Sequence, residues 1–137
     1  MRRLRAAAQI LLGAAMVGAG TGHLTFQREE FQAQVPPWVP IDEDLTVLLS
    51  GAVEIGLGAA LLVTWKQPRR ALAGAALAAF YVAIFPGNIA QYTEHRDAFG
   101  LDTDTKRLAR LFFQPLLIAW ALAATDAPRV WRESRQA

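Results

Sequence analysis

The sequence contains no cysteine, and this absence excludes disulfide bonds and thiol chemistry carried by the chain's own residues. Only two histidines are present, His23 and His95, and no spacing of potential ligands repeats a metal-binding motif. A glycine-rich phosphate loop after a strand is also missing, because the GxG pairs lie inside apolar segments. No nucleophile stands beside an evident base. The sequence therefore indicates neither a metal centre nor a nucleotide site, and it assigns no catalytic residue.

Charged residues are scarce too, at 19% of the 137 positions, whereas hydrophobic residues make up 53%. Soluble domains are about 45–50% apolar even when glycine is counted. Four apolar segments recur along the chain, and about 20 helical residues are enough to cross ~30 Å of hydrocarbon. We therefore predict an all-α integral membrane four-helix bundle. Its spans are expected at about 6–26, 45–65, 71–92 and 108–125, in one domain over residues 1–137.

The basic residues set the expected orientation in the membrane. Arg2, Arg3 and Arg5 precede the first segment, so a cleaved signal peptide is an alternative there, although the length of the segment favours a retained helix. With the N-terminus in the cytoplasm, most of the 14 Lys and Arg residues lie on the cytoplasmic side. We expect a bacterial inner (plasma) membrane protein with both termini cytoplasmic. The pI of 9.5 reflects these flanking residues, so no nucleic-acid partner is expected.

Each predicted span carries a polar residue that hydrocarbon disfavours: His23, Glu54, Asn88 and Gln114, the last with Arg110 nearby. Glu54 stands without another formal charge in its apolar segment, where a charge costs about 2.5–3.5 kcal/mol. At ~1.5 Å per helical residue, all four positions fall in the same half of the bilayer. We therefore predict one polar pocket that these residues share.

Helical spacing places Ser50 on the face of Glu54, together with Gly51 and Gly58, and these glycines are expected to let a neighbouring helix approach. The candidate ligand-binding residues are His23, Ser50, Glu54, Asn88, Arg110 and Gln114. Asn88 and Gln114 serve equally well as interhelical hydrogen bonds, worth about 0.6–1.7 kcal/mol. A carboxylate is a costly choice for that purpose, so Glu54 is the strongest functional candidate. Arg110 either extends toward the membrane surface or pairs with Glu54.

Two further patterns bear on the packing. Residues 35–40 contain three prolines and a tryptophan, which predicts a stiff extended segment, either a plain surface connector or a lid over a cavity. In the third span, small residues recur every fourth position from Ala71 to Gly87, a pattern that favours close helix packing in membranes.

Several short motifs, in order along the chain, resemble the DoxX-like family of small four-helix membrane proteins. They are Gly22-His23-Leu24, the loop with Phe31 and Val35-Pro36-Pro37-Trp38-Val39-Pro40, Leu49-Ser50-Gly51-Ala52-Val53-Glu54, Phe85-Pro86-Gly87-Asn88-Ile89 and Arg110-Leu111-Phe112-Phe113-Gln114. The resemblance covers nearly the whole chain and implies a membrane redox or oxidative-stress context, with a membrane oxidoreductase as a partner. It also implies a quinone as the candidate cofactor or ligand. Without cysteine, the chain cannot be a thiol relay.

The leading functional hypothesis is an accessory membrane protein, more plausibly not an enzyme on its own, that binds a small hydrophobic quinone- or lipid-like ligand. One alternative is a proton-coupled transporter subunit. The other is an assembly factor whose polar residues only fix the packing. Beyond the lipid bilayer, a homo-oligomer is a further candidate partner, because small-residue faces suit contacts between copies as well as contacts inside one bundle.

Overall fold

The computed structural model describes residues 1–136, and all regular elements in that range are helices, without a strand. Its elements are α1 (Arg2–Leu24), α2 (Arg28–Gln32), α3 (Glu43–Val63), α4 (Arg69–Thr93), α5 (Asp104–Ala124) and α6 (Ala127–Gln136). The helices α1, α3, α4 and α5 are long and apolar enough to cross a membrane. The predicted all-α class and the four spans are confirmed. The short helices α2 and α6 were not predicted.

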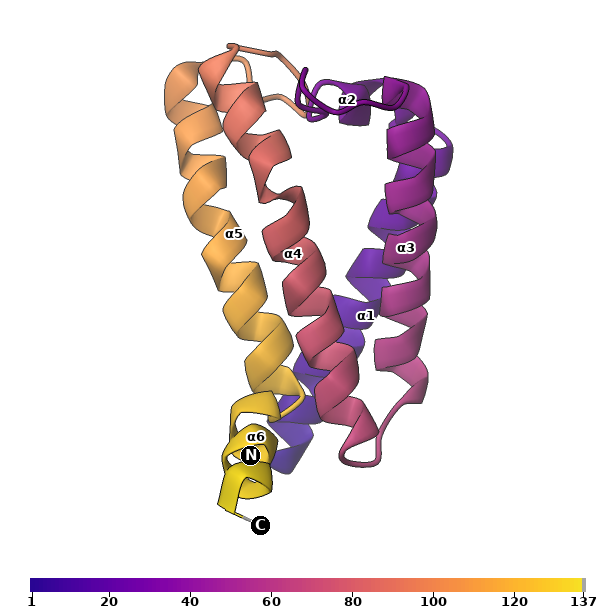
Figure 1. The fold of residues 1–137 in the computed structure, drawn as a ribbon, viewed down its shortest axis with the longest axis vertical. Coiled ribbons are helices and arrows are strands. Elements are labelled where there is room, and N and C mark those ends of the chain that lie inside the picture. Colours follow the sequence, from indigo (N-terminus) through magenta and orange to yellow (C-terminus); the bar gives the residue numbers. More distant parts are fainter. Residues whose placement is uncertain (137) are drawn as a thin grey trace.

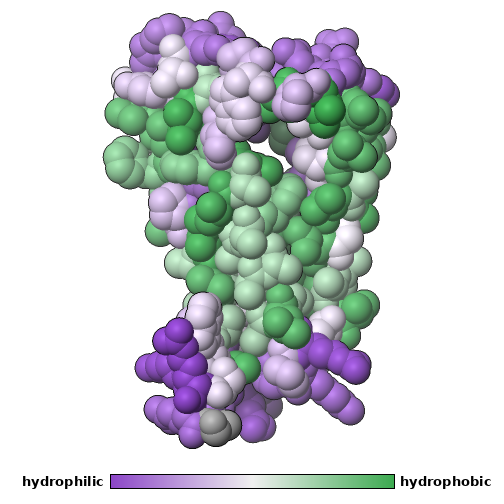
Figure 2. Space-filling view, in the orientation of Figure 1, coloured by the Kyte–Doolittle hydropathy of each residue, from purple (hydrophilic) through white to green (hydrophobic). Residues whose placement is uncertain are grey.

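The four long helices form two pairs. α1 lies against α3, and α4 lies against α5 (Figure 1). The pairs meet at the end of the bundle that carries both termini, which we call the terminal end. They separate toward the other end, where α2 and residues 33–42 cross between them; we call this segment the cap. On the face that Figure 2 shows, hydrophobic side chains form a belt across the middle of the molecule, with polar residues at both ends.

Two long helices begin a few residues before the apolar segments, at polar capping residues. The side chain of Asp42 accepts a hydrogen bond from the backbone N–H of Leu45 at 3.1 Å. Thr103 accepts in the same way from the N–H of Lys106 at 3.2 Å. Such caps satisfy N–H groups that have no partner inside the helix. They explain why the helix limits differ from those of the hydropathy pattern.

Glycines bring the backbones of α1 and α3 together at two levels. A Cβ atom on Gly58 would lie 2.7 Å from the carbonyl oxygen of Gly13. A Cβ atom on Gly20 would lie 2.7 Å from the carbonyl oxygen of Gly51. Contacts this short leave no room for a methyl group. The expectation that glycines beside Glu54 admit a neighbouring helix is thus confirmed, and the neighbour is α1.

The small residues of α4 behave differently from the expectation. Ala71 and Gly87 are buried, but Ala75, Ala79 and Ala83 between them are exposed, although the spacing predicts one packing face. The buried face of α4 instead carries Leu77 and Tyr81. A helix has 3.6 residues per turn, so a strict four-residue spacing drifts around its surface. The bulky side chains decide which face turns inward.

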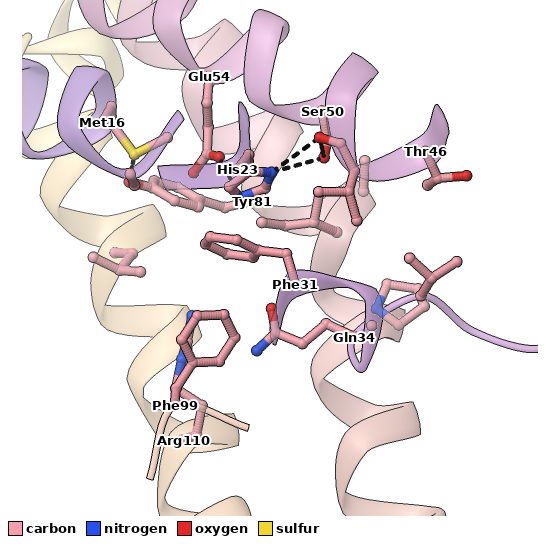
Figure 3. Close-up of a pocket in the computed structure, with 18 of the residues that line it drawn as sticks. Met16, His23, Phe31, Gln34, Thr46, Ser50, Glu54, Tyr81, Phe99 and Arg110 are labelled. Atoms are coloured by element: carbon pink, nitrogen blue, oxygen red, sulfur yellow. Dashed lines mark hydrogen bonds and ion pairs between the residues drawn. The ribbon is translucent and has the colours of Figure 1, made fainter. Parts of the chain in front are cut away.

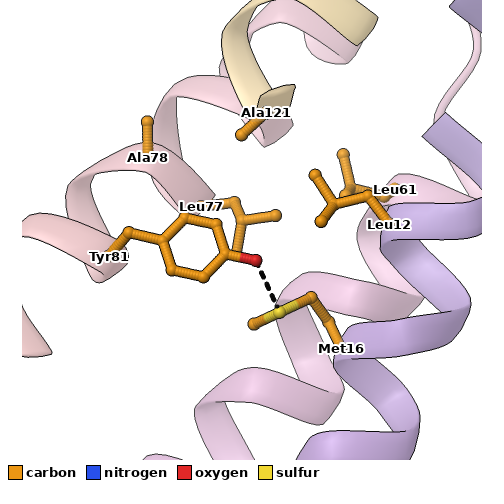
Figure 4. Close-up of a cluster of buried hydrophobic side chains, with 7 residues drawn as sticks. All are labelled: Leu12, Met16, Leu61, Leu77, Ala78, Tyr81 and Ala121. Atoms are coloured by element: carbon orange, nitrogen blue, oxygen red, sulfur yellow. Dashed lines mark hydrogen bonds between the residues drawn. The ribbon is translucent and has the colours of Figure 1, made fainter. Parts of the chain in front are cut away.

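The packed core fills the terminal half of the bundle. It contains Leu12, Met16, Leu61, Leu77, Ala78, Tyr81 and Ala121 (Figure 4). Beyond it, the buried Gln9 donates to the carbonyl of Leu61 at 2.7 Å, and Arg70 donates to Gln9 at 2.6 Å and to the carbonyl of Ala124 at 2.8 Å. These bonds tie all four long helices together at the terminal end. Within residues 1–136, the capped half has no equivalent core.

If the α1–α3 contact depends on glycine's lack of a side chain, Gly58→Ala will lower the free energy of unfolding by about 1–3 kcal/mol, because the added methyl group overpacks against the backbone of α1. Reversible unfolding in detergent micelles measures this. Gly56→Ala is the matched control on the same helix, since nothing lies within 4 Å of its added Cβ. The control should be neutral, or more stable by up to about 1 kcal/mol. Equal effects of the two substitutions would contradict the packing.

Candidate functional site

A cavity of about 540 Å³ lies between the two helix pairs, beneath the cap. This volume falls within the range of small-molecule sites, about 300–1,000 Å³. The lining comes from α1, α3, α4, α5, the cap and the loop that holds Phe99. Most of it is aliphatic or aromatic. Three polar residues, Glu54, His23 and Ser50, lie together on one wall, whereas Gln34 and Arg110 line the cavity elsewhere (Figure 3). The cavity has the composition of a site for a molecule that is largely apolar with one polar end.

Glu54 is the central group of the polar wall. Its residue is 6% exposed, and its Oε2 lies 2.8 Å from Nε2 of His23. The contact is close but poorly aligned, so Oε2 has no hydrogen-bond donor in good geometry among the described residues. A buried carboxylate oxygen without an aligned donor is unusual, because desolvation without hydrogen bonding is unfavourable. Glu54 therefore retains unused hydrogen-bonding capacity at the cavity.

His23 is oriented by α3. Its Nδ1 lies 3.2 Å from the carbonyl oxygen of Val47 and 3.1 Å from Oγ of Ser50. When Nδ1 donates to that carbonyl, a neutral imidazole presents a lone pair at Nε2 toward Glu54. Nε2 and Oε2 of Glu54 then face each other at 2.8 Å without an aligned hydrogen bond. Both atoms thus remain available to a hydrogen-bonding group on a bound molecule.

Aromatic rings close the cavity from the capped end. The ring centroid of Phe31 lies 3.4 Å from that of His23, and Phe99 meets Phe31 at 4.6 Å.

On the α3 side, Nε of Arg28 donates to Oδ1 of Asp44 at 2.6 Å, and this bond raises the pKa of the Arg28 guanidinium above its ordinary value. Arg28 is solvent-exposed, so this pair positions α2 more than it stabilises the fold.

The cap is also fixed to α4. Nε2 of Gln34 donates to Gln91 at 3.0 Å and to Asn88 at 3.3 Å. Arg96, in the loop after α4, donates to the carbonyl oxygens of Ala33 and Val35 at 3.1 and 2.8 Å. Cap residues on both sides of the prolines line the cavity. Of the two interpretations of this segment, connector and lid, the position over a cavity fits the lid.

The structure divides the six predicted site residues into two groups. His23, Ser50, Glu54 and Arg110 line the cavity. The other two are buried outside its lining and bonded to protein groups: Asn88 accepts from Gln34, and Gln114 donates to the carbonyl of Tyr81 at 2.8 Å.

Arg110 follows neither of the two expectations. Its Nη1 donates to Oε1 of Gln114 at 3.1 Å, and its guanidinium lies 5.5 Å from the ring centroid of Phe113. It forms no ion pair with Glu54 among the described residues. A guanidinium with free N–H groups therefore remains at the cavity, available to an acceptor on a bound molecule.

The sequence interpretation missed Tyr81 and Gln34 as cavity residues. The hydroxyl of Tyr81 donates to Sδ of Met16 at 2.8 Å, between α4 and α1. Tyr81 stands in the middle of an apolar segment, and this position was an available signal. Gln34 and Phe99 belong to connecting segments, where no periodicity announces an inward side chain. No cluster of three or more His, Cys, Asp or Glu residues suited to a metal occurs in the described part of the chain.

A family described as Domain of unknown function (DUF8561) matches residues 12–125. The chain belongs to this family. No curated protein matches it, and no solved structure does. The range that this DUF8561 protein shares with its family includes every residue that lines the cavity and leaves out α6.

The different roles of Gln114 and Glu54 give a testable contrast in stability. Gln114→Leu should lower the free energy of unfolding of delipidated protein by about 0.6–1.7 kcal/mol, because the carbonyl of Tyr81 loses its donor. Glu54→Gln should leave stability unchanged or raise it, since functional groups are often placed at the expense of stability. Chemical unfolding in micelles measures both. A loss for Glu54→Gln as large as that for Gln114→Leu would make Glu54 a packing residue.

Proposed function

We propose that this DUF8561 protein binds an amphipathic small molecule, quinone- or lipid-like, in the cavity beneath the cap. One observation supports the proposal above all: a buried carboxylate without an aligned donor faces a cavity of about 540 Å³. A structural carboxylate in hydrocarbon is expected to be fully bonded to protein. Glu54 is instead suited to receive its donor from a ligand.

The lining supports a particular orientation of that ligand. A hydroxyl on the ligand donates to Oε2 of Glu54, while a carbonyl accepts from Arg110. Phe31 and Phe99 offer faces and edges to an aromatic ring, an arrangement worth about 0.5–1.5 kcal/mol per pair beyond burial. Aliphatic residues of α1 and α5, among them Leu12 and Leu117, surround the remainder. A quinone or quinol has this combination of ring oxygens and apolar body.

The wider role that we propose is that of an accessory subunit in a membrane redox or oxidative-stress context, as the resemblance to DoxX-like proteins implies. In that role the protein would present a bound quinone to a partner oxidoreductase or act within a homo-oligomer. Both termini lie at the same end of the bundle (Figure 1), which agrees with an even number of spans. We propose that this end is cytoplasmic in a bacterial inner membrane, by the distribution of basic residues.

Mass spectrometry of molecules that co-purify in mild detergent tests the proposal. We expect a quinone or a defined lipid at near-stoichiometric amount in the wild type, and at least tenfold less in Glu54→Gln. The control is Glu133→Gln, which removes an exposed carboxylate on α6 and should keep the ligand. The same content in all three proteins, or a wild type without ligand, would refute binding at Glu54. Loss of abundance without change in ligand would favour the assembly factor.

A proton-coupled transporter subunit is the second candidate, because His23 and Glu54 lie close enough to exchange a proton. It requires solute or proton flux in liposomes that disappears in Glu54→Gln under an imposed pH gradient. We expect Glu133→Gln to leave such flux unchanged. Absence of flux in the wild type at every imposed gradient would remove this candidate and leave the binding proposal intact.

A further inference from the structure

The cavity reaches the surface sideways, between the two helix pairs. Ala83 of α4 and Ala15 of α1 both line the cavity and are both exposed. The opening on the face of α3 and α4 lies just below the cap (Figure 2). On the face of α1 and α5, Ala15 is joined by Phe113, which lines the cavity and is 48% exposed. Small side chains thus stand at the edges where the two pairs separate.

These edges lie at hydrocarbon depth. From the capped end of its helix, Ala83 is about 15 Å away and Ala15 about 14 Å, at ~1.5 Å per residue. Both positions are near the middle of a bilayer core ~30 Å thick. On the face that Figure 2 shows, the surface at this depth is the apolar belt. Lipid chains, and molecules dissolved among them, therefore contact these openings.

The route from water crosses the cap, where Trp38 lines the cavity and is 70% exposed but other cap residues cover the polar wall. Phe31 lies over His23, and Gln34 bonds the cap to α4. The backbone of Gln34 also lies directly against Gly87 of α4, where no side chain intervenes. Entry from water requires these contacts to break, whereas the exposed Ala15 and Ala83 already stand at the lateral openings.

We propose that the ligand enters the cavity laterally from the bilayer interior, and that its polar end is uncharged. The inference rests on the proposed binding function and names the route and the class of ligand. Glu54 lies about 16 Å along α3 from Glu43, at ~1.5 Å per residue. A phosphate or ammonium head would have to leave the aqueous layer to reach it, which strongly disfavours charged lipids. A ring hydroxyl or carbonyl on a lipophilic body reaches that depth unaided.

Because the chain has no cysteine, one introduced thiol can report on access. Ser50→Cys, in lipid nanodiscs, is treated with uncharged N-ethylmaleimide or with a maleimide that carries a sulfonate. Each rate is divided by that at Ser134→Cys, on the exposed face of α6. We expect this normalised rate to be at least tenfold higher for the uncharged reagent than for the sulfonated one. Ala19→Cys, a second cavity position, replaces Ser50→Cys if that variant does not fold.

Tryptophans at the openings test the route itself. Ala15→Trp with Ala83→Trp should slow the uncharged reagent at least fivefold. Ala14→Trp with Ala79→Trp is the matched control, since both alanines are exposed on the same helices and neither lines the cavity. Equal rates for the two reagents, unaffected by the tryptophans, would mean entry from water and overturn the proposal. No reaction at either cavity cysteine would mean a closed cavity and overturn it as well.

Protection of the same cysteine tests the class of ligand. A benzoquinol with a ten-carbon tail should reduce the rate of modification at least fivefold, and dodecylphosphocholine at the same concentration should not. Equal protection, or none by either probe, would overturn the uncharged-head assignment. The access rates are measured without a ligand, so they can show lateral access even if no ligand co-purifies. Lateral access without a co-purified ligand would refute the proposed function and leave the proposed route intact.

Discussion

The close approach of α1 and α3 is the constraint on which the site depends. Gly20 and Gly51 let the two backbones meet, and a Cβ atom on Gly51 would lie 3.0 Å from the carbonyl oxygen of Gly20. The same approach sets His23 against α3, where Val47 and Ser50 orient its ring and Glu54 lies beside it. In a membrane, helix association depends on such close packing because lipid is as apolar as the side chains. The glycines therefore determine the chemistry of the site as well as the packing.

The two ends of the bundle have different roles. At the terminal end, buried hydrophobic residues and the bonds of Gln9 and Arg70 hold all four helices together. At the capped end, α4 and α5 stand apart from α1 and α3, and the cap bridges them through hydrogen bonds of Gln34 and Arg96. A bundle tied firmly at one end tolerates a cavity at the other. Stability and binding are thus separated along the helix axis.

The fold was predictable because hydrocarbon allows few choices. Apolar segments of spanning length must be helices, since every backbone group has to be bonded within the segment. Glu54 and His23 were recognisable because polar groups in such segments are expensive. The face of α4 that packs was not predictable, because Leu77 and Tyr81 compete with the alanines and only the assembled bundle decides between them. The cavity depends on how far the helix pairs separate, and hydropathy carries no information about that angle.

The polar residues of the spans also show why type and depth alone do not identify a site. Gln114 and Glu54 both lie near the middle of their helices, and both are buried. Gln114 uses its amide on the carbonyl of Tyr81 and on Arg110, so its hydrogen-bonding capacity serves the protein. Among the described residues, the one polar contact of the Glu54 side chain is with the imidazole of His23, and that contact is poorly aligned. In this bundle, a binding residue differs from a packing residue in the hydrogen-bonding capacity that the protein leaves unused. That property can be recognised only when the neighbouring helices are in place.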